Sequence, residues 1–264
     1  MSDWRTYDDV AETYERVHAF RFAEVARDLV EQMGLDDRSR VLDVGTGTGV
    51  AAQVAADAGA RVVGIDESLG MLRVARRERP KVPVVAAEAL DQPFGPSSFD
   101  AVLGSFVLAH FNKVETALFD IDRVLRVGGR IGFTSWADGV DAYQQTWREM
   151  IEGVVPREIL APAYAEAAPW HERFRSRTAV EETLVDAGFR SVRTEVAKYH
   201  WTYPLDEYLD GLQVWATARF VKDMLGVSGW ASLQERTRAV FAERFPDPLN
   251  DFREVIIATA TKPG

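Results

Sequence analysis

The stretch Arg40-Val41-Leu42-Asp43-Val44-Gly45-Thr46-Gly47-Thr48-Gly49 decides the fold of this chain. Its first half, residues 40–44, is a short apolar run typical of a buried parallel strand. Three glycines then occupy every second position, and residues 50–56 have a helical pattern. A strand, a glycine turn and a helix in this order predict an α/β sheet whose carboxyl edge presents backbone N–H groups to a ligand.

The spacing of these glycines indicates the kind of ligand. A dinucleotide fingerprint reads G-x-G-x-x-G and holds a pyrophosphate at the helix N-terminus. This chain has G-x-G-x-G, with Asp43 two residues before Gly45, and a carboxylate there suits a cationic group better than a pyrophosphate. The motif resembles the first motif of class I S-adenosylmethionine (SAM)-dependent methyltransferases. A glycine turn that binds nothing is the alternative for this motif alone.

Composition sets wider limits on the chain. With 264 residues, of which 47% are hydrophobic, it can form one large globular domain with room for a lid. No apolar run is long enough to cross a bilayer, and the N-terminus lacks the pattern of a signal peptide. The absence of cysteine excludes disulfides and thiolate metal sites. We therefore expect a soluble cytoplasmic protein without a metal site, and the net charge of −10 argues against a nucleic-acid partner.

The N-terminal segment has a pattern of its own. Residues 8–33 have the apolar periodicity of a helix that ends at Gly34. Its beginning, Tyr7-Asp8-Asp9-Val10-Ala11-Glu12-Thr13-Tyr14, resembles the Y-D-x-x-A-x-x-Y opening of methyltransferases of the ubiquinone/menaquinone type. The resemblance implies that residues 1–38 form a helical gate over the cofactor, with Tyr14 and Arg21 near its methionine end. Simple packing of the tyrosines on the core is the alternative reading.

The second predicted strand, residues 61–66, ends at Asp66, which lies 21 positions after Gly45. An acidic residue at this place can accept both ribose hydroxyls, and Glu67 is the alternative acceptor. The segment Asp66-Glu67-Ser68-Leu69-Gly70-Met71-Leu72 resembles the D-x-S-x-x-M-L block of the same family. Met71 would then pack against the adenine, unless it is an ordinary core residue.

Two further blocks follow the third and fourth predicted strands, residues 82–86 and 101–105. The loop Glu88-Ala89-Leu90-Asp91-Gln92-Pro93-Phe94 resembles the family's D-A-x-x-L-P-F loop, so Glu88 would accept the adenine N6 hydrogens. The segment from Phe106 to Phe111 resembles the part of the family that lies beside the transferred methyl. A predicted helix over residues 113–127, stopped by two glycines, precedes the fifth strand, residues 131–136.

The resemblance covers residues 7–136 nearly continuously and implies a fold for the whole chain. That fold is α/β, a Rossmann-like seven-stranded sheet with the last strand antiparallel, flanked by helices and carrying a helical lid. The chain would be a single domain, residues 1–264, and we assign its parts as follows: the SAM-binding core, 39–136; the lid segments, 137–177 and 204–245; and the segments that complete the sheet, 178–203 and 251–264. A capping box at Thr178–Glu181 predicts one helix start, and residues 204–224 and 228–245 read as two helices.

Site residues follow from the motifs and from the aromatic content of the lid. The predicted cofactor contacts are Tyr14, Arg21, Asp43, Gly45, Thr46, Gly47, Asp66, Glu67, Met71, Glu88, Ala89 and Ser105. The predicted acceptor contacts are Phe106, His110, Trp136, Trp147, Trp170 and Trp215, although dense aromatics can equally form the core of a small cap.

His110 leads the candidates for a catalytic base because it follows the fourth strand; His18, His171 and His200 are weaker candidates. The predicted activity is in-line methyl transfer from SAM, with S-adenosylhomocysteine (SAH) as product, to O, N or C of a small-molecule metabolite such as a natural product or quinone. Transfer by proximity alone remains open. Two alternative functions also remain open, namely an inactive SAM-binding protein and an NAD-dependent oxidoreductase. We expect a monomer or homodimer without a membrane partner.

Overall fold

The computed structural model describes residues 6–139 and 141–264 of the chain. The described residues form a seven-stranded sheet with the order β3-β2-β1-β4-β5-β7-β6. The strands are β1 (Arg40–Val44), β2 (Arg61–Asp66), β3 (Val84–Ala86), β4 (Phe99–Ser105), β5 (Leu125–Trp136), β6 (Arg190–Tyr203) and β7 (Leu249–Thr261). β1 pairs in parallel with β2 and β4, whereas β7 is antiparallel to both β5 and β6. The predicted Rossmann-like sheet with an antiparallel last strand is therefore confirmed.

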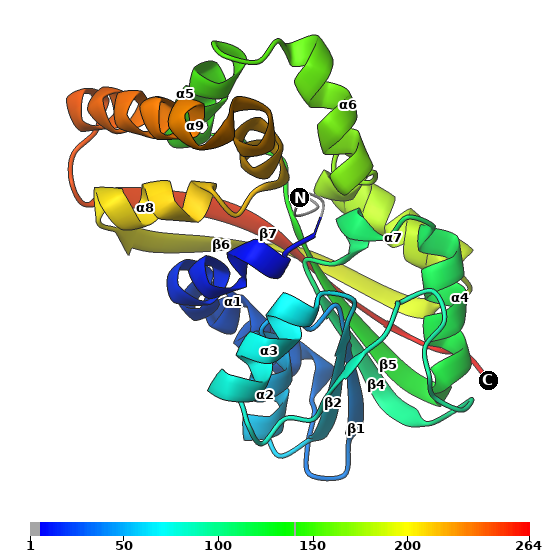
Figure 1. The fold of residues 1–264 in the computed structure, drawn as a ribbon. Coiled ribbons are helices and arrows are strands. Elements are labelled where there is room, and N and C mark those ends of the chain that lie inside the picture. Colours follow the sequence, from blue (N-terminus) through cyan, green and yellow to red (C-terminus); the bar gives the residue numbers. More distant parts are fainter. Residues whose placement is uncertain (1–5, 140) are drawn as a thin grey trace.

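Helices cover both faces of this sheet (Figure 1). Alternate residues of β1 face opposite ways: Val41 joins one apolar cluster with Val25 and Leu29, and Leu42 joins another with Leu118 and Ile121. The first face carries α1 (Ala11–Met33) and α2 (Val50–Asp57), with α3 (Leu69–Glu78) beside them; the second carries α4 (Val114–Val124) and α7 (Arg177–Asp186). The second half of α1 is thus a core helix, because Val25, Ala26 and Leu29 are fully buried.

The remaining helices lie mostly beyond the carboxyl edge of the parallel strands. α5 (Ala142–Glu152) and α6 (Arg157–Ala167) both contact α9 (Ala216–Arg244), and the three stand together above the sheet in Figure 1. We call these three helices the lid. α8 (Leu205–Leu212) instead packs on α1 and β6, so this part of segment 204–245 covers the sheet. Short 3-10 turns occur at η1 (Asp8–Val10), η2 (Leu108–His110) and η3 (Arg173–Arg175).

Three local predictions were wrong. The helix predicted over residues 113–127 ends at Val124, and the two glycines after it lie inside β5, which begins at Leu125. β5 is long enough to include them because Gly128 and Gly129 extend its pairing toward Lys262 of the C-terminal segment. Helix α7 is capped by Ser176, whose hydroxyl accepts the Ala179 N–H, rather than by a capping box at Thr178.

The third wrong prediction concerns the helix expected over residues 204–224. It is interrupted at residues 213–215, whereas the break expected between residues 224 and 228 is present at Gly226, whose φ of 64° and ψ of −176° are not helical. A positive φ at this position is available to glycine at little steric cost, so α9 consists of two helical parts joined by a kink at this residue.

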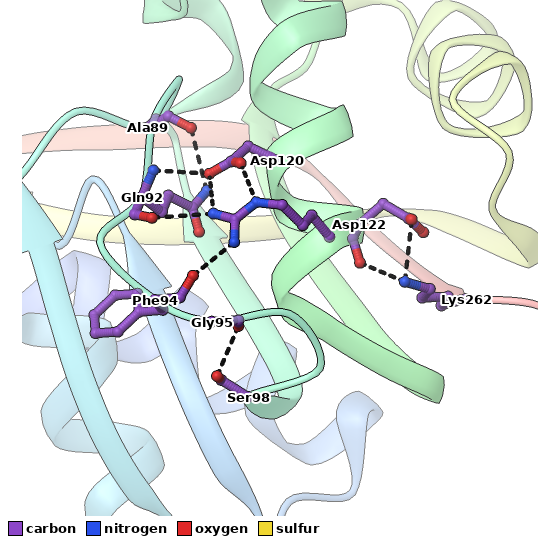
Figure 2. A network of polar contacts seen from close by, with 9 residues as sticks. Ala89, Gln92, Phe94, Gly95, Ser98, Asp120, Asp122 and Lys262 are labelled. Atoms are coloured by element: carbon purple, nitrogen blue, oxygen red, sulfur yellow. Dashed lines mark hydrogen bonds and ion pairs between the residues drawn. The ribbon is translucent and has the colours of Figure 1, made fainter.

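A partly buried polar clamp fixes the loop that follows β3 (Figure 2). The guanidinium of Arg123 on α4 donates to the carbonyls of Phe94 and Gln92, at 2.6 and 3.0 Å, and pairs with Asp120. Asp120 in turn accepts the Gln92 backbone N–H at 2.8 Å. A guanidinium can serve a carboxylate and two carbonyls at once because its donors are fixed in one plane. The loop carrying Glu88 and Ala89 is therefore tied to α4 although it contains no helix or strand.

Replacing Arg123 by lysine should lower the free energy of unfolding by about 1–3 kcal/mol, because an ammonium cannot reproduce the bonds to both carbonyls. Arg126→Lys is the matched control, since Arg126 is half-exposed in an ion pair with Asp100 and its replacement should cost less than about 1 kcal/mol. Urea unfolding of the three proteins measures the difference. Equal free energies of unfolding for the two variants would show that the clamp stabilises the fold no more than the exposed ion pair does.

Candidate functional site

One large cavity of about 1340 Å³ lies between the carboxyl edge of the sheet and the lid. Its walls come from three parts of the chain: the N-terminal segment, the glycine turn with the loops after β2, β3 and β4, and the lid. A typical site for one small molecule has a volume of about 300–1,000 Å³, so this cavity has room for two ligands side by side. The parts that surround it divide naturally into a half next to the glycine turn and a half beneath the lid.

The glycine turn forms the floor of the first half. Gly45, Gly47 and Gly49 all have positive φ values, between 56° and 86°. A side chain at Gly45 would also collide with Val107, so this position combines a left-handed backbone with a close approach. The turn is held against β2 because Asp66 accepts the Gly47 N–H at 2.8 Å. The sequence motif thus produces an open backbone surface that faces the cavity.

Asp66 lies at the centre of this half. Besides the Gly47 N–H, its carboxylate accepts the N–H of Ser68 at 2.8 Å. Burial raises the pKa of Asp66 to about 6, although both N–H donors favour the ionised form. A carboxylate offers about four acceptor positions, so two remain for hydroxyl groups of a ligand. Around it, the predicted cofactor residues Gly45, Gly47, Glu67, Met71, Glu88, Ala89 and Ser105 all line the cavity.

The structure does not bring Asp43 and Thr46 to the cavity, in contrast to the prediction. Both are almost fully buried beneath the glycine turn, where the Thr46 hydroxyl donates to Asp43 at 2.6 Å. Burial raises the pKa of Asp43 to about 7, and the bond from Thr46 opposes the rise only in part. These residues therefore support the turn from below, because a side chain at the end of a buried strand points into the core as readily as toward the edge.

The N-terminal segment closes one side of the cavity through Tyr7, Tyr14 and Arg21. The two tyrosine rings meet edge to face with centroids 6.1 Å apart. Arg21 is almost fully buried; its guanidinium pairs with Asp251 at 3.5 Å and lies 5.2–5.9 Å from several ring centroids, among them those of Phe22 and Trp215. A guanidinium held by aromatic rings keeps its charge while it borders an apolar cavity.

Aromatic side chains line the second half. Phe106 and Trp136 stack with centroids 4.4 Å apart at the ends of β4 and β5, and Phe22 lies 5.0 Å from Phe106. Phe106 has a φ of 56°, which is unusual for a large residue, and its N–H donates to the Thr134 hydroxyl at 3.0 Å. Trp147 and Trp215 of the lid region complete this wall.

Trp170 was predicted to contact the acceptor, but it does not line the cavity. Its ring packs toward Phe174, with the centroids 6.4 Å apart, in the apolar cluster between α4, α7 and the sheet. Its backbone N–H donates to the carbonyl of Ala109 at 3.3 Å. Trp170 therefore supports the loop before His110 from outside the cavity.

Two of the four histidines line the cavity, namely His110 and His171. Nδ1 of His110 lies 3.1 Å from the carbonyl of Ala167, which fixes Nδ1 as the protonated nitrogen and leaves the Nε2 lone pair free. Loss of hydration within the surrounding protein lowers the pKa of His110 below 6.5, and the positive charge of Arg219 lowers it further. Burial also lowers the pKa of His171, to about 4, so both rings are neutral at pH 7.

The other two histidines lie elsewhere. His18 is buried behind Trp215 and lies 3.1 Å from the carbonyl of Gly211, while His200 stacks on Phe252 on the outer side of β6. Neither lines the cavity.

Tyr164 and Asp8 are among the cavity residues that were not predicted as site residues. Tyr164 of α6 contacts His171, one of the weaker base candidates, with centroids 4.9 Å apart, and both line the lid side. Asp8 lines the opposite rim and bonds to the beginning of α3. Asp8 belongs to the Y-D block at the N-terminus, so a sequence motif could have indicated it as a site residue. No sequence motif indicates the pairing of Tyr164 with His171, because that contact depends on how the lid folds.

The comparisons agree with this geometry. Residues 42–133 match the family model described as a methyltransferase domain. A demethylmenaquinone methyltransferase of Streptomyces avermitilis is 36% identical over 196 residues, covering 70% of this chain and 85% of the relative. Another, from Renibacterium salmoninarum, is 40% identical over 129 residues, covering 47% of this chain and 54% of the relative. A solved protein from Anaeromyxobacter dehalogenans, assigned as a type II methyltransferase, shares the fold at a TM-score of 0.63 and 20% identity, over 90% of this chain and 97% of the other.

The fold and the glycine turn at the edge of the cavity define a Rossmann-like methyltransferase. The chain belongs to the class I SAM-dependent methyltransferases of the ubiquinone/menaquinone-methyltransferase-like type. SAM is the methyl donor of this class and hence the cofactor of this enzyme. Within residues 6–139 and 141–264, no helix is long and apolar enough to cross a bilayer. No group of acidic or histidine side chains in the same residues could hold a metal ion.

Removing the Thr46 hydroxyl should destabilise the protein in a pH-dependent way. Because the pKa of Asp43 is about 7 in the folded chain and near 3.8 in the unfolded chain, the folded state binds the extra proton and stability falls as the pH rises between these values. Thr46→Val removes the donor to the ionised form, so its stability loss should be about 1–3 kcal/mol at pH 8 and smaller at pH 5.

Thr46→Ser keeps the hydroxyl and serves as the control, with little dependence of its stability loss on pH. Chemical denaturation at both pH values measures the effect. An equal loss for Thr46→Val at pH 5 and pH 8 would contradict ionisation of Asp43 in this range.

Proposed function

We propose that the enzyme transfers a methyl group from SAM to a sizeable apolar or aromatic small molecule, such as a quinone or a natural product. The observation that supports this most directly is the shared cavity: one wall carries the cofactor motifs, and the other carries stacked aromatic rings of β4, β5 and the lid. Relatives named demethylmenaquinone methyltransferase point to a quinone-like acceptor. An apolar pocket with few polar groups is the usual form of such a site.

In this proposal the adenosine part of SAM occupies the half beside the glycine turn. Asp66 uses its two remaining acceptor positions for the ribose hydroxyls, and Glu67 lies next to it at the cavity wall. Glu88 and Ala89, held by the Arg123 clamp, take the adenine edge, and Met71 packs against the ring. Arg21 and Tyr14 face the methionine end, where the guanidinium pairs with the carboxylate.

The acceptor then lies between the Phe106–Trp136 pair and the lid. SAM supplies a methyl group on a sulfonium, so the chain has to hold the acceptor atom in line behind that methyl and exclude water. The stacked rings and Trp215 present flat apolar surfaces that suit a planar acceptor. The choice among oxygen, nitrogen and carbon depends on which atom of the acceptor these surfaces bring to the methyl.

His110 is the general base of this proposal for acceptors that must lose a proton. Its free Nε2 follows from the contact of Nδ1 with Ala167, and its lowered pKa keeps the ring neutral at physiological pH. His171 lines the same part of the cavity and packs edge to face on Tyr164, whereas the contact with the Ala167 carbonyl orients the His110 ring, so His110 is the better oriented of the two.

Trp215→Ala should raise the KM for the acceptor about tenfold or more, because it removes a large apolar surface from the acceptor half. SAM affinity should fall by a smaller factor, since Trp215 lies away from the glycine turn and is only one of several rings around Arg21. Trp170→Ala is the matched control: the ring is also half-buried but lies outside the cavity, so the acceptor KM should stay unchanged. The measurement is steady-state methyl transfer with quinols and phenols chosen to fill the cavity. If the two variants behave alike, the acceptor does not bind beneath the lid.

His110→Ala should lower kcat about 100-fold or more for a phenolic acceptor and leave the affinity for SAH unchanged, because general-base catalysis contributes about 10²–10⁴-fold. In the wild type, kcat/KM should rise with pH as the imidazole loses its proton, with a midpoint below 6.5. This acidic limb should disappear in the variant. A chain that binds SAH but transfers no methyl to any acceptor tested would instead favour a SAM-binding protein without catalysis.

A further inference from the structure

Three carboxylates line one side of the N-terminal segment at helical spacing. Asp8, Glu12 and Glu15 follow each other at i, i+4 and i+7, and each contacts α3 or the residues at its ends. Glu12 forms a two-point ion pair with Arg77, at 2.6 and 2.7 Å. Glu15 forms another with Arg79, at 3.0 and 2.8 Å, and both of these side chains are largely buried. These three carboxylates therefore form a row of contacts that attaches the N-terminal segment to the cofactor half.

The contacts at both ends of this row involve residues that also bond to the predicted cofactor-binding loops. Arg79 also donates to the carbonyl of Thr48 in the glycine turn, at 2.9 Å. At the other end, one oxygen of Asp8 accepts the Ser68 hydroxyl and the Gly70 N–H, each at 2.7 Å. Ser68 is itself the N-cap of α3, and its own N–H is bonded to Asp66. Displacement of Asp8 would thus disturb the residues around Asp66 directly.

Gly70 makes the contact with Asp8 sterically possible. A Cβ at this position would lie 2.5 Å from the Cα of Asp8 and 2.8 Å from its carbonyl carbon, and closer still to the carbonyl oxygen. Such separations are shorter than van der Waals contact, and the opposing atoms belong to the backbone, so a small rotation of a side chain cannot relieve them. The backbone of Gly70 itself does not need a glycine, because it is helical without a positive φ.

We propose that Asp8 and Gly70 form a clasp that holds the N-terminal segment closed over the cofactor, and that they act as positioning residues for SAM. Asp8 supplies a negative charge at the N-terminus of α3, where unpaired N–H groups favour it, and Gly70 supplies the space. The clasp extends the proposed cofactor arrangement, on which it rests, by naming the residues that decide whether Tyr7 and Tyr14 stay over the site.

Gly70→Ala tests the clasp because its effects on the helix and on the clasp have opposite signs. Alanine favours α3 more than glycine does, which offsets part of the stability lost with the Asp8 contacts, so any fall in the melting temperature should be small. The added methyl should nevertheless push residues 6–10 away and weaken SAH binding about tenfold or more in calorimetry. Asp8→Ala should weaken it similarly, whereas Asp8→Asn retains an oxygen acceptor and should keep most of the affinity.

The double variant Asp8→Ala/Gly70→Ala should bind SAH no more weakly than the weaker single variant, because both changes break the same contact. Hydrogen exchange without ligand should show faster exchange in residues 6–20 of Gly70→Ala and no change in β1 and β4. Gly229→Ala, which places the same substitution in α9 away from the cavity, is the control and should change neither property.

Wild-type SAH affinity together with wild-type exchange in Gly70→Ala would overturn the proposal, as would effects of the two substitutions that multiply. Failure of the wild-type chain itself to bind SAH would contradict the cofactor arrangement, while the exchange comparison would still decide whether the clasp exists.

Discussion

The parallel pairing of β1 with β2 and β4 is the constraint on which the site depends. Parallel strands end at a common edge, so the glycine turn after β1, the acidic residue after β2 and the aromatic segment after β4 must meet there. The hydrogen bond between Gly47 and Asp66 joins two of these loops directly. Because the edge is defined by the sheet, the lid does not have to shape the cofactor half. The N-terminal segment adds a wall and the Asp8 contacts to an edge that the strands have already formed.

The parts of the structure that sequence could predict are those determined by neighbouring residues. The strands around the glycine turn and the place of Asp66 at the end of β2 follow from short motifs with a steric or electrostatic reason. The roles of residues that point away from the edge were harder to predict. The motif indicates that Asp43 and Thr46 belong to the site, but it does not indicate whether they face the ligand or support the turn. The structure shows the second arrangement.

The aromatic residues of the predicted lid segments illustrate the opposite case. They are equally dense in sequence around Trp147, Trp170 and Trp215, but of these three tryptophans only Trp147 and Trp215 line the cavity. What separates them is contact with distant elements: Trp170 packs with Phe174 beside α4, and Trp147 lies near Trp230 of α9. Helical periodicity gives the buried face of one helix but not which neighbour covers it. The end of α4 was misplaced for a related reason, since Gly128 and Gly129 bond to Lys262, which directly follows β7 and lies more than 130 residues later in the chain.

The position of β7 has a consequence for the order in which the enzyme is made. β7 lies between β5 and β6, so β5 has an unpaired edge and β6 has no neighbour in the sheet until residues 249–261 have left the ribosome. Phe252, Arg253 and Glu254 of this strand also line the cavity beneath the lid. The nascent chain can therefore form the cofactor half from residues that precede β6, whereas the acceptor half is complete only after residues 249–261 have been made. Long-range pairing of this kind is slow and leaves an apolar edge open to chaperones and to aggregation in the meantime.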